Sequence, residues 1–181
     1  MRNIVKPQIF SWPHLLENKP PLVELFIGSI KEAYWAENHL VRTLLRLMNA
    51  SSSRDLKHLL NYHIERTKMH CSKLEHIFEL LDETIEARKN DSVSGLSMEA
   101  NEMIEYTDDG TATRNMGVIL ICQKIEQYEI ATYTGLIRLS ATIGRDDVAN
   151  LFSEILDDES ECLKFLTNQS EIIIVKAVDE V

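Results

Sequence analysis

The placement of proline restricts the fold of this chain more than any other feature. All four prolines lie within the first 21 residues, and none follows in the 181-residue chain. Because proline removes a backbone donor and breaks helices, its absence permits long uninterrupted helices over most of the sequence. We therefore expect an extended N-terminal arm over residues 1–21, followed by a helical domain.

Apolar residues recur at steps of three and four in four long segments, which is the spacing of helices around a shared core. The predicted helices cover residues 22–48, residues 54–82, residues 113–142 and a segment beginning near residue 144. The polar stretch 83–112 is long enough for a crossover that carries a short helix at about 95–106. This pattern predicts an all-α, ferritin-like antiparallel four-helix bundle over residues 22–170, with a long crossover between helices two and three. The tail, residues 171–181, is expected to form a strand or a contact between subunits.

Charge and cysteine content narrow the function. A formal net charge of −10 disfavours nucleic-acid binding, which needs a basic surface, and suits a protein that attracts cations. The three cysteines form no CxxC pair, which indicates reduced thiols in a reducing compartment. No signal-peptide pattern begins the chain, and the aliphatic run "IIIV" at 172–175 is too short to cross a bilayer. We expect a cytoplasmic protein with no nucleic-acid or membrane partner.

Each predicted helix carries an ionisable residue near its middle, where the apolar spacing calls for a core residue. These residues are Glu37, His63, Arg66, His70, Glu126, Glu129 and Glu159. Helix midpoints meet at similar depth in an antiparallel bundle, so these side chains are expected to meet in the interior. A buried carboxylate without a partner is costly, so the group needs a metal, a cationic side chain or protons. Carboxylates with imidazole at the centre of four helices are the donors of di-iron and di-manganese sites.

The same segments carry a resemblance to a known family. "AYWAENHL", "HIERTKMH", "QKIEQYEIATY" and "LDDES" resemble the signature segments of the YciF-type ferritin-like family of small bacterial stress-associated proteins. The resemblance spans about residues 22–170 and implies a rubrerythrin-like bundle, frequent dimerisation and a potential di-metal centre. It implies ligands for one or two iron or manganese ions at Glu37, His63, Glu126, Glu129 and Glu159.

The chain departs from the family pattern at several of these positions. Arg66 and Leu163 replace acids, Gln127 replaces a histidine, and His70 replaces an amide. A guanidinium can neutralise carboxylates by bidentate pairing without any metal. Arg66 is therefore a predicted substitute for a metal, and the centre is expected to hold one ion at most, or none. His70 is expected to be structural.

The sequence leaves two placements open for the acids. A shift in helix register would move Glu37, Glu129 and Glu159 to a solvated rim, where they would form no site.

Cys162 lies three residues after Glu159 and is predicted to be a core thiol that could approach a bound metal.

Three functions are compatible with these residues. The first is a metal-binding protein with redox or iron-handling chemistry. The second is a metal-free structural or interaction protein in which Arg66 pairs the buried carboxylates. The third is a subunit that acts through its arm and tail. No glycine-rich phosphate loop or GxSxG elbow is present, so no reaction class is indicated.

Apolar residues outside the helix seams predict self-association. Trp35, Val41 and Tyr62 lie off the inward faces of the first two predicted helices. Such residues indicate a second packing surface, and we expect a homodimer.

Overall fold

All regular structure in the described residues is α-helical. The computed structural model describes residue 12 and residues 20–180. Its helices are α2 (Pro21–Ala50), α3 (Arg54–Leu80), α4 (Asp91–Tyr106), α5 (Ala112–Thr142) and α6 (Asp146–Val178). The prediction of an all-α fold is confirmed for this part of the chain. Most of the predicted N-terminal arm lies outside the described residues and stays a prediction.

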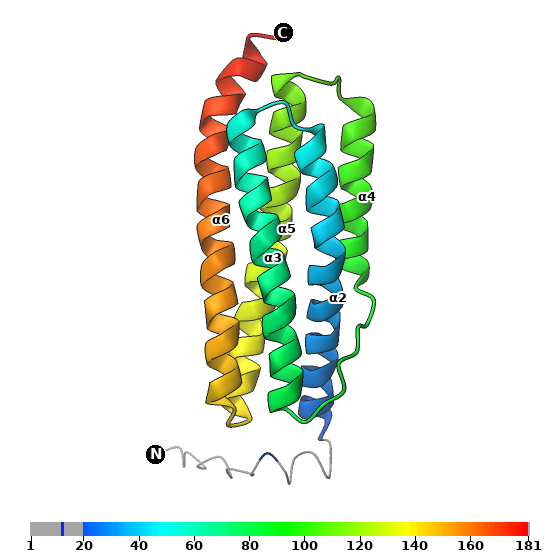
Figure 1. Ribbon diagram of the computed structural model, residues 1–181, viewed down its shortest axis with the longest axis vertical. Coiled ribbons are helices and arrows are strands. Elements are labelled where there is room, and N and C mark those ends of the chain that lie inside the picture. Colours follow the sequence, from blue (N-terminus) through cyan, green and yellow to red (C-terminus); the bar gives the residue numbers. More distant parts are fainter. Residues whose placement is uncertain (1–11, 13–19, 181) are drawn as a thin grey trace, which may run out of the picture.

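The four long helices lie side by side, with the shorter α4 on the outside (Figure 1). Helix α2 packs against α3 and α5, and α6 packs against the same two helices, so the four enclose one interior. Neighbouring long helices run in opposite directions (Figure 1). Helix α4 belongs to the long connection between α3 and α5, and it packs against α2 and α5.

Side-chain caps set where several helices begin. Ser53 accepts a hydrogen bond from the backbone N–H of Leu56 at the start of α3. Asn90 does the same for Val93 at the start of α4. Such caps satisfy N–H groups that have no partner within the helix. The Asn90 cap explains why α4 begins at Asp91, earlier than the predicted start at about residue 95.

The C-terminal segment is helical, which corrects the strand considered for residues 171–181. Helix α6 continues without a break to Val178. Ile173 is buried in the core, and the Glu180 carboxylate accepts hydrogen bonds from the backbone N–H groups of Ala112 and Thr113. A carboxylate at a helix N-terminus is favourable because the unpaired N–H groups carry partial positive charge. These contacts tie the end of α6 to the start of α5.

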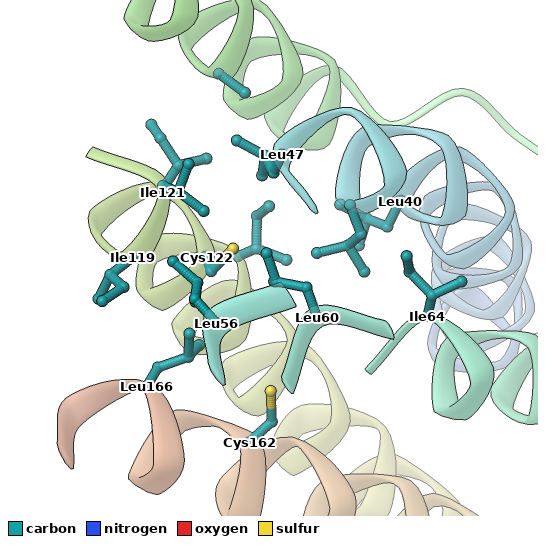
Figure 2. Packing of buried hydrophobic residues seen from close by; sticks show 14 of the residues in the cluster. Leu40, Leu47, Leu56, Leu60, Ile64, Ile119, Ile121, Cys122, Cys162 and Leu166 are labelled. Atoms are coloured by element: carbon teal, nitrogen blue, oxygen red, sulfur yellow. The ribbon is translucent and has the colours of Figure 1, made fainter. Parts of the chain in front are cut away.

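Two clusters of buried apolar residues fill the interior. The upper cluster includes Leu40, Leu47, Leu60 and Leu166 (Figure 2). The lower cluster includes Phe26, Ile30, Phe78 and Phe152. On each long helix, the buried ionisable residues lie near the point where one apolar cluster gives way to the other, so a polar layer lies between two apolar ones. Within the described part of the chain, no helix combines the length and apolar character needed to cross a membrane.

Candidate metal centre

Six ionisable side chains form the polar layer, which we call the central cluster. They are Glu37 from α2, His63 and His70 from α3, Glu126 and Glu129 from α5, and Glu159 from α6. Each exposes 3% of its surface or less. The five residues predicted as ligands therefore lie together in the interior and not on a solvated rim. Their role as metal ligands stays a prediction.

Helical spacing places these side chains on inward faces. On α3, residues 63, 67, 70 and 74 are all buried, at steps of four, three and four. These steps keep side chains on one face of a helix. On α5, Glu126 and Glu129 are three residues apart and share a face for the same reason.

Glu159 connects the two imidazoles. His63 Nδ1 lies 3.1 Å from Glu126 Oε1, and His63 Nε2 lies 3.3 Å from Glu159 Oε2. His70 Nδ1 lies 2.9 Å from Glu159 Oε1 and 3.6 Å from Glu37 Oε1. The Tyr133 hydroxyl donates a short hydrogen bond to Glu37. Glu159 of α6 thus contacts two histidines of α3, and these histidines in turn contact Glu126 of α5 and Glu37 of α2.

Many polar atoms of the central cluster nevertheless lack a hydrogen bond. The close approaches above fall within ion-pair distance, but most lack the angles of a hydrogen bond. Among the described residues, the buried unpaired atoms are Glu37 Oε2, both ring nitrogens of His63, His70 Nδ1, Glu126 Oε2 and both carboxylate oxygens of Glu159. Buried polar atoms without partners are rare in folded proteins because each costs the desolvation energy of the group. All of the unpaired atoms belong to residue types that bind metals.

Burial and pairing divide the carboxyl groups into two kinds. Burial, reinforced by the charge of Glu159, raises the pKa of Glu126 and of Glu129 well above the usual range. Burial also acts to raise the pKa of Glu159, but the two histidines at ion-pair distance, His63 and His70, outweigh burial and hold that pKa well below the usual range. Without a metal, burial therefore favours the protonated forms of Glu126 and Glu129, whereas the neighbouring histidines favour the ionised form of Glu159.

His70 is the main cationic group of the central cluster. Burial alone would lower its pKa, but pairing with Glu159 and Glu37 outweighs burial and raises the pKa to about 10. Sequence reasoning placed His70 on the inner face and expected it to be structural. The structure puts it in direct contact with two of the predicted ligands.

The donor atoms form two overlapping groups, each compact enough for one cation. The first group takes one atom each from His63, Glu126, Glu129 and Glu159, all within 4.8 Å of one another. The second group takes one atom each from Glu37, His70 and Glu159, within the same limit. Glu159 belongs to both groups. Imidazole and carboxylate donors together suit first-row transition metals.

Asp158 contacts His70 from outside the central cluster. The Nε2–H group of His70 donates to Asp158 Oδ2 at 3.1 Å. A carboxylate on the far nitrogen fixes the orientation of a metal-binding histidine and leaves the other nitrogen free to face the metal. Sequence reasoning missed Asp158 because nothing in "LDDES" distinguishes it from Asp157.

Arg66 does not reach the central cluster, which corrects the prediction that it pairs the buried carboxylates. Its Nη2 lies 3.0 Å from Asp158 Oδ1, and 30% of its side chain is exposed. The guanidinium packs over the Tyr62 ring, 5.2 Å from its centroid. The inward steps of α3 run through Thr67, so Arg66 falls one position off the inner face. Arg66 is therefore an outer contact and not a substitute for a metal.

The chain belongs to the family described as a domain of unknown function (DUF892), which it matches over residues 21–179. It is similar to the protein YciF of Escherichia coli (strain K12), with 32% identity over 143 residues, covering 78% of this chain and 86% of that protein. The crystal structure of the E. coli stress protein YciF has a TM-score of 0.82 at 31% identity, covering 86% of this chain and 98% of that one. These findings confirm the resemblance to the YciF-type family.

A more distant solved structure shares the fold. YcfI from Rhodopseudomonas palustris has a TM-score of 0.76 at 23% identity, covering 91% of this chain and 98% of that one.

The two kinds of carboxyl group predict opposite effects of Glu→Gln substitutions on the metal-free protein. Glu129 is ionised in the unfolded chain at pH 7, and its raised pKa makes folding take up a proton, which opposes folding. Glu129→Gln removes this cost and should leave stability unchanged or raise it by about 1 kcal/mol.

The lowered pKa of Glu159 stabilises the fold above pH 4.5. Glu159→Gln removes the carboxylate closest to His70 Nδ1, leaving the more distant Glu37 on that side of the ring, and should cost about 3 kcal/mol.

Urea denaturation at pH 7 in excess chelator measures both effects. The opposite order, with Glu129→Gln the more destabilising substitution, would contradict the raised pKa of Glu129 and the lowered pKa of Glu159.

Proposed function

We propose that this YciF-family protein is a ferritin-like, antiparallel four-helix bundle whose central cluster binds divalent iron or manganese. Support for the topology comes from the connections between helices. Residues 51–53 join α2 to α3, and residues 143–145 join α5 to α6, whereas the connection from α3 to α5 is long and contains α4. Two short connections around one long crossover are typical of ferritin-like bundles.

The observation that carries metal binding is the set of unpaired donor atoms in the central cluster. These atoms come from all four long helices and face one interior. A divalent cation satisfies several carboxylate and imidazole lone pairs at once and supplies positive charge where the cluster has an excess of acids. Two divalent cations would balance the four carboxylates of the cluster when both histidines are neutral.

The two donor groups would hold two ions through a shared carboxylate. His63, Glu126 and Glu129 would bind the first ion, Glu37 and His70 the second, and Glu159 both. When bound, the metal would supply redox and Lewis-acid chemistry. Tyr133 holds Glu37 in place and Asp158 orients His70. The two apolar clusters keep bulk water from the site.

Because E. coli YciF is called a stress protein, we infer a role in stress response.

Elemental analysis of protein purified without chelator tests this function. The wild-type protein should carry about one or two iron or manganese ions per chain. Glu159→Gln should lose most of this metal because Glu159 belongs to both donor groups. Asp157→Asn, which changes an exposed acid two positions away on the same helix, should retain it. Equal metal content in the two variants would contradict the proposal.

A metal-free structural protein is the second candidate. Its support is the position of His70 between Glu37 and Glu159, which neutralises part of the charge without a metal. The version of this function that relied on Arg66 loses its basis, because Arg66 pairs with Asp158. Absence of copurified metal, together with a melting temperature unaffected by added iron or manganese, would favour this second function.

We also propose that the protein forms a homodimer through the outer face of α3. Tyr62 and Met69 expose 47% and 49% of their surface, and they lie seven residues apart on one helix face. Trp35 and Val41 are half-buried against the upper cluster, so they contribute less to this surface than the sequence indicated. Paired apolar residues on an exposed helix face are typical of a packing surface.

Light scattering after size exclusion tests the dimer. The wild-type protein should have twice the 20.8 kDa chain mass. Changing both Tyr62 and Met69 to Glu should yield the monomer. Met98→Glu, at a residue 62% exposed on α4, is the matched control and should remain dimeric. A wild-type mass equal to that of one chain at micromolar concentration would exclude the dimer.

A further inference from the structure

We propose, on the basis of the metal-binding function proposed above, that Cys162 is a thiolate ligand to the ion held by His63 and Glu126. This ligand would give the central cluster an added preference for thiophilic divalent cations, Fe²⁺, Co²⁺ and Zn²⁺, over Mn²⁺. Carboxylate and imidazole ligands are shared by many metals, whereas a thiolate is a soft ligand that manganese rarely takes.

The position of Cys162 brings its sulfur to the donor atoms of the first group. Cys162 follows Glu159 by three residues, which puts both side chains on the inner face of α6. Figure 2 shows its side chain pointing from α6 into the interior, and 6% of its surface is exposed. Cys162 Sγ lies 3.4 Å from Glu126 Oε1, and that oxygen lies 3.1 Å from His63 Nδ1.

These three donors are close enough to share one cation. The sulfur, a Glu126 oxygen and a His63 nitrogen all lie within 4.8 Å of one another. His63 and Glu126 expose 1% and 0% of their surface, yet both His63 nitrogens and Glu126 Oε2 have no hydrogen bond. Cys162 therefore faces buried polar atoms that lack partners.

Cys122 shows what a structural thiol looks like in the same interior. It is fully buried in the upper cluster, one helical turn before Glu126 on α5. It belongs to none of the candidate metal-binding groups found among the described residues. The two thiols share burial and cluster, and they differ in facing the metal donors. Cys122 is therefore the matched control for Cys162.

Metal binding at Cys162 exchanges a proton for a cation. Without metal, the Cys162 S–H group donates to Glu126, and burial beside the carboxyl groups of Glu126 and Glu159 keeps the thiol pKa above its usual value. When the metal–sulfur bond forms, the thiol proton is released to solvent, and the cation takes over the interaction with Glu126. No oxidant or reductant is required.

Cobalt substitution of the full-length protein tests the thiolate directly. A thiolate bound to Co²⁺ gives an intense near-ultraviolet charge-transfer band that nitrogen and oxygen ligands do not give. After chelator treatment and loading with Co²⁺, the wild type and Cys122→Ser should show this band. Cys162→Ser should lose the band and still bind Co²⁺ through the remaining donors.

Affinity measurements add a second readout. Any site with these donors binds Mn²⁺ more weakly than Co²⁺ or Zn²⁺, so the informative quantity is the change caused by the substitution. Cys162→Ser should raise the Kd for Co²⁺ and Zn²⁺ by about tenfold or more, and the Kd for Mn²⁺ by less than about threefold.

The outcomes separate the thiolate from the metal-binding function. Co²⁺ bound by the wild type without the band, or a band that persists in Cys162→Ser, overturns the thiolate and leaves metal binding intact. A wild type that binds neither Co²⁺ nor Zn²⁺ nor Mn²⁺ overturns both the thiolate ligand and the metal-binding function. X-ray absorption of the Zn²⁺-loaded wild type does not depend on how the variants fold. It should show a Zn–S distance of about 2.3 Å, and its absence overturns the thiolate.

Discussion

The structure depends on neutralising four carboxylates that share one buried layer. Each ionised carboxylate loses its hydration on burial, a cost that only charge pairing, protonation or metal binding offsets. The two apolar clusters close the layer on both sides, so the compensation comes from within the cluster. His70 offsets part of the charge, and the raised pKa values of Glu126 and Glu129 favour protonation, which offsets more. Neither supplies partners for all the oxygen and nitrogen atoms that remain unpaired, and this is the physical case for a cation.

Charges alternate from the surface to the centre along one path. Arg66 pairs with Asp158, Asp158 accepts from His70, and His70 contacts Glu159. Arg66 therefore lies at the outer end of this path and not in the central cluster. The expectation of one ion at most rested on a guanidinium inside the cluster. With Arg66 outside, the six residues of the central cluster keep two overlapping donor groups.

The helices and the burial of Glu37, Glu129 and Glu159 were predictable because one periodicity runs through each long helix. The errors occurred where periodicity is ambiguous or silent. Arg66 and Thr67 are adjacent and about 100° apart around α3, so either could continue a seam of threes and fours. The run "IIIV" has no helical period, so the sequence does not reveal the helix. The helix is favoured by the burial of Ile173 and by the hydrogen bonds that the Glu180 carboxylate accepts at the start of α5. Asp158 is found only by its contact with His70, which requires three dimensions.

Anomalous X-ray scattering from crystals of the protein loaded with iron tests the central claim most directly. Data collected on either side of the iron absorption edge locate the ion independently of the protein model. We predict a peak between α3, α5 and α6, within about 2.0–2.2 Å of donor atoms of His63, Glu126 and Glu159. Iron found only at surface acids, with no peak inside the central cluster, would contradict the claim that these buried carboxylates form a metal centre.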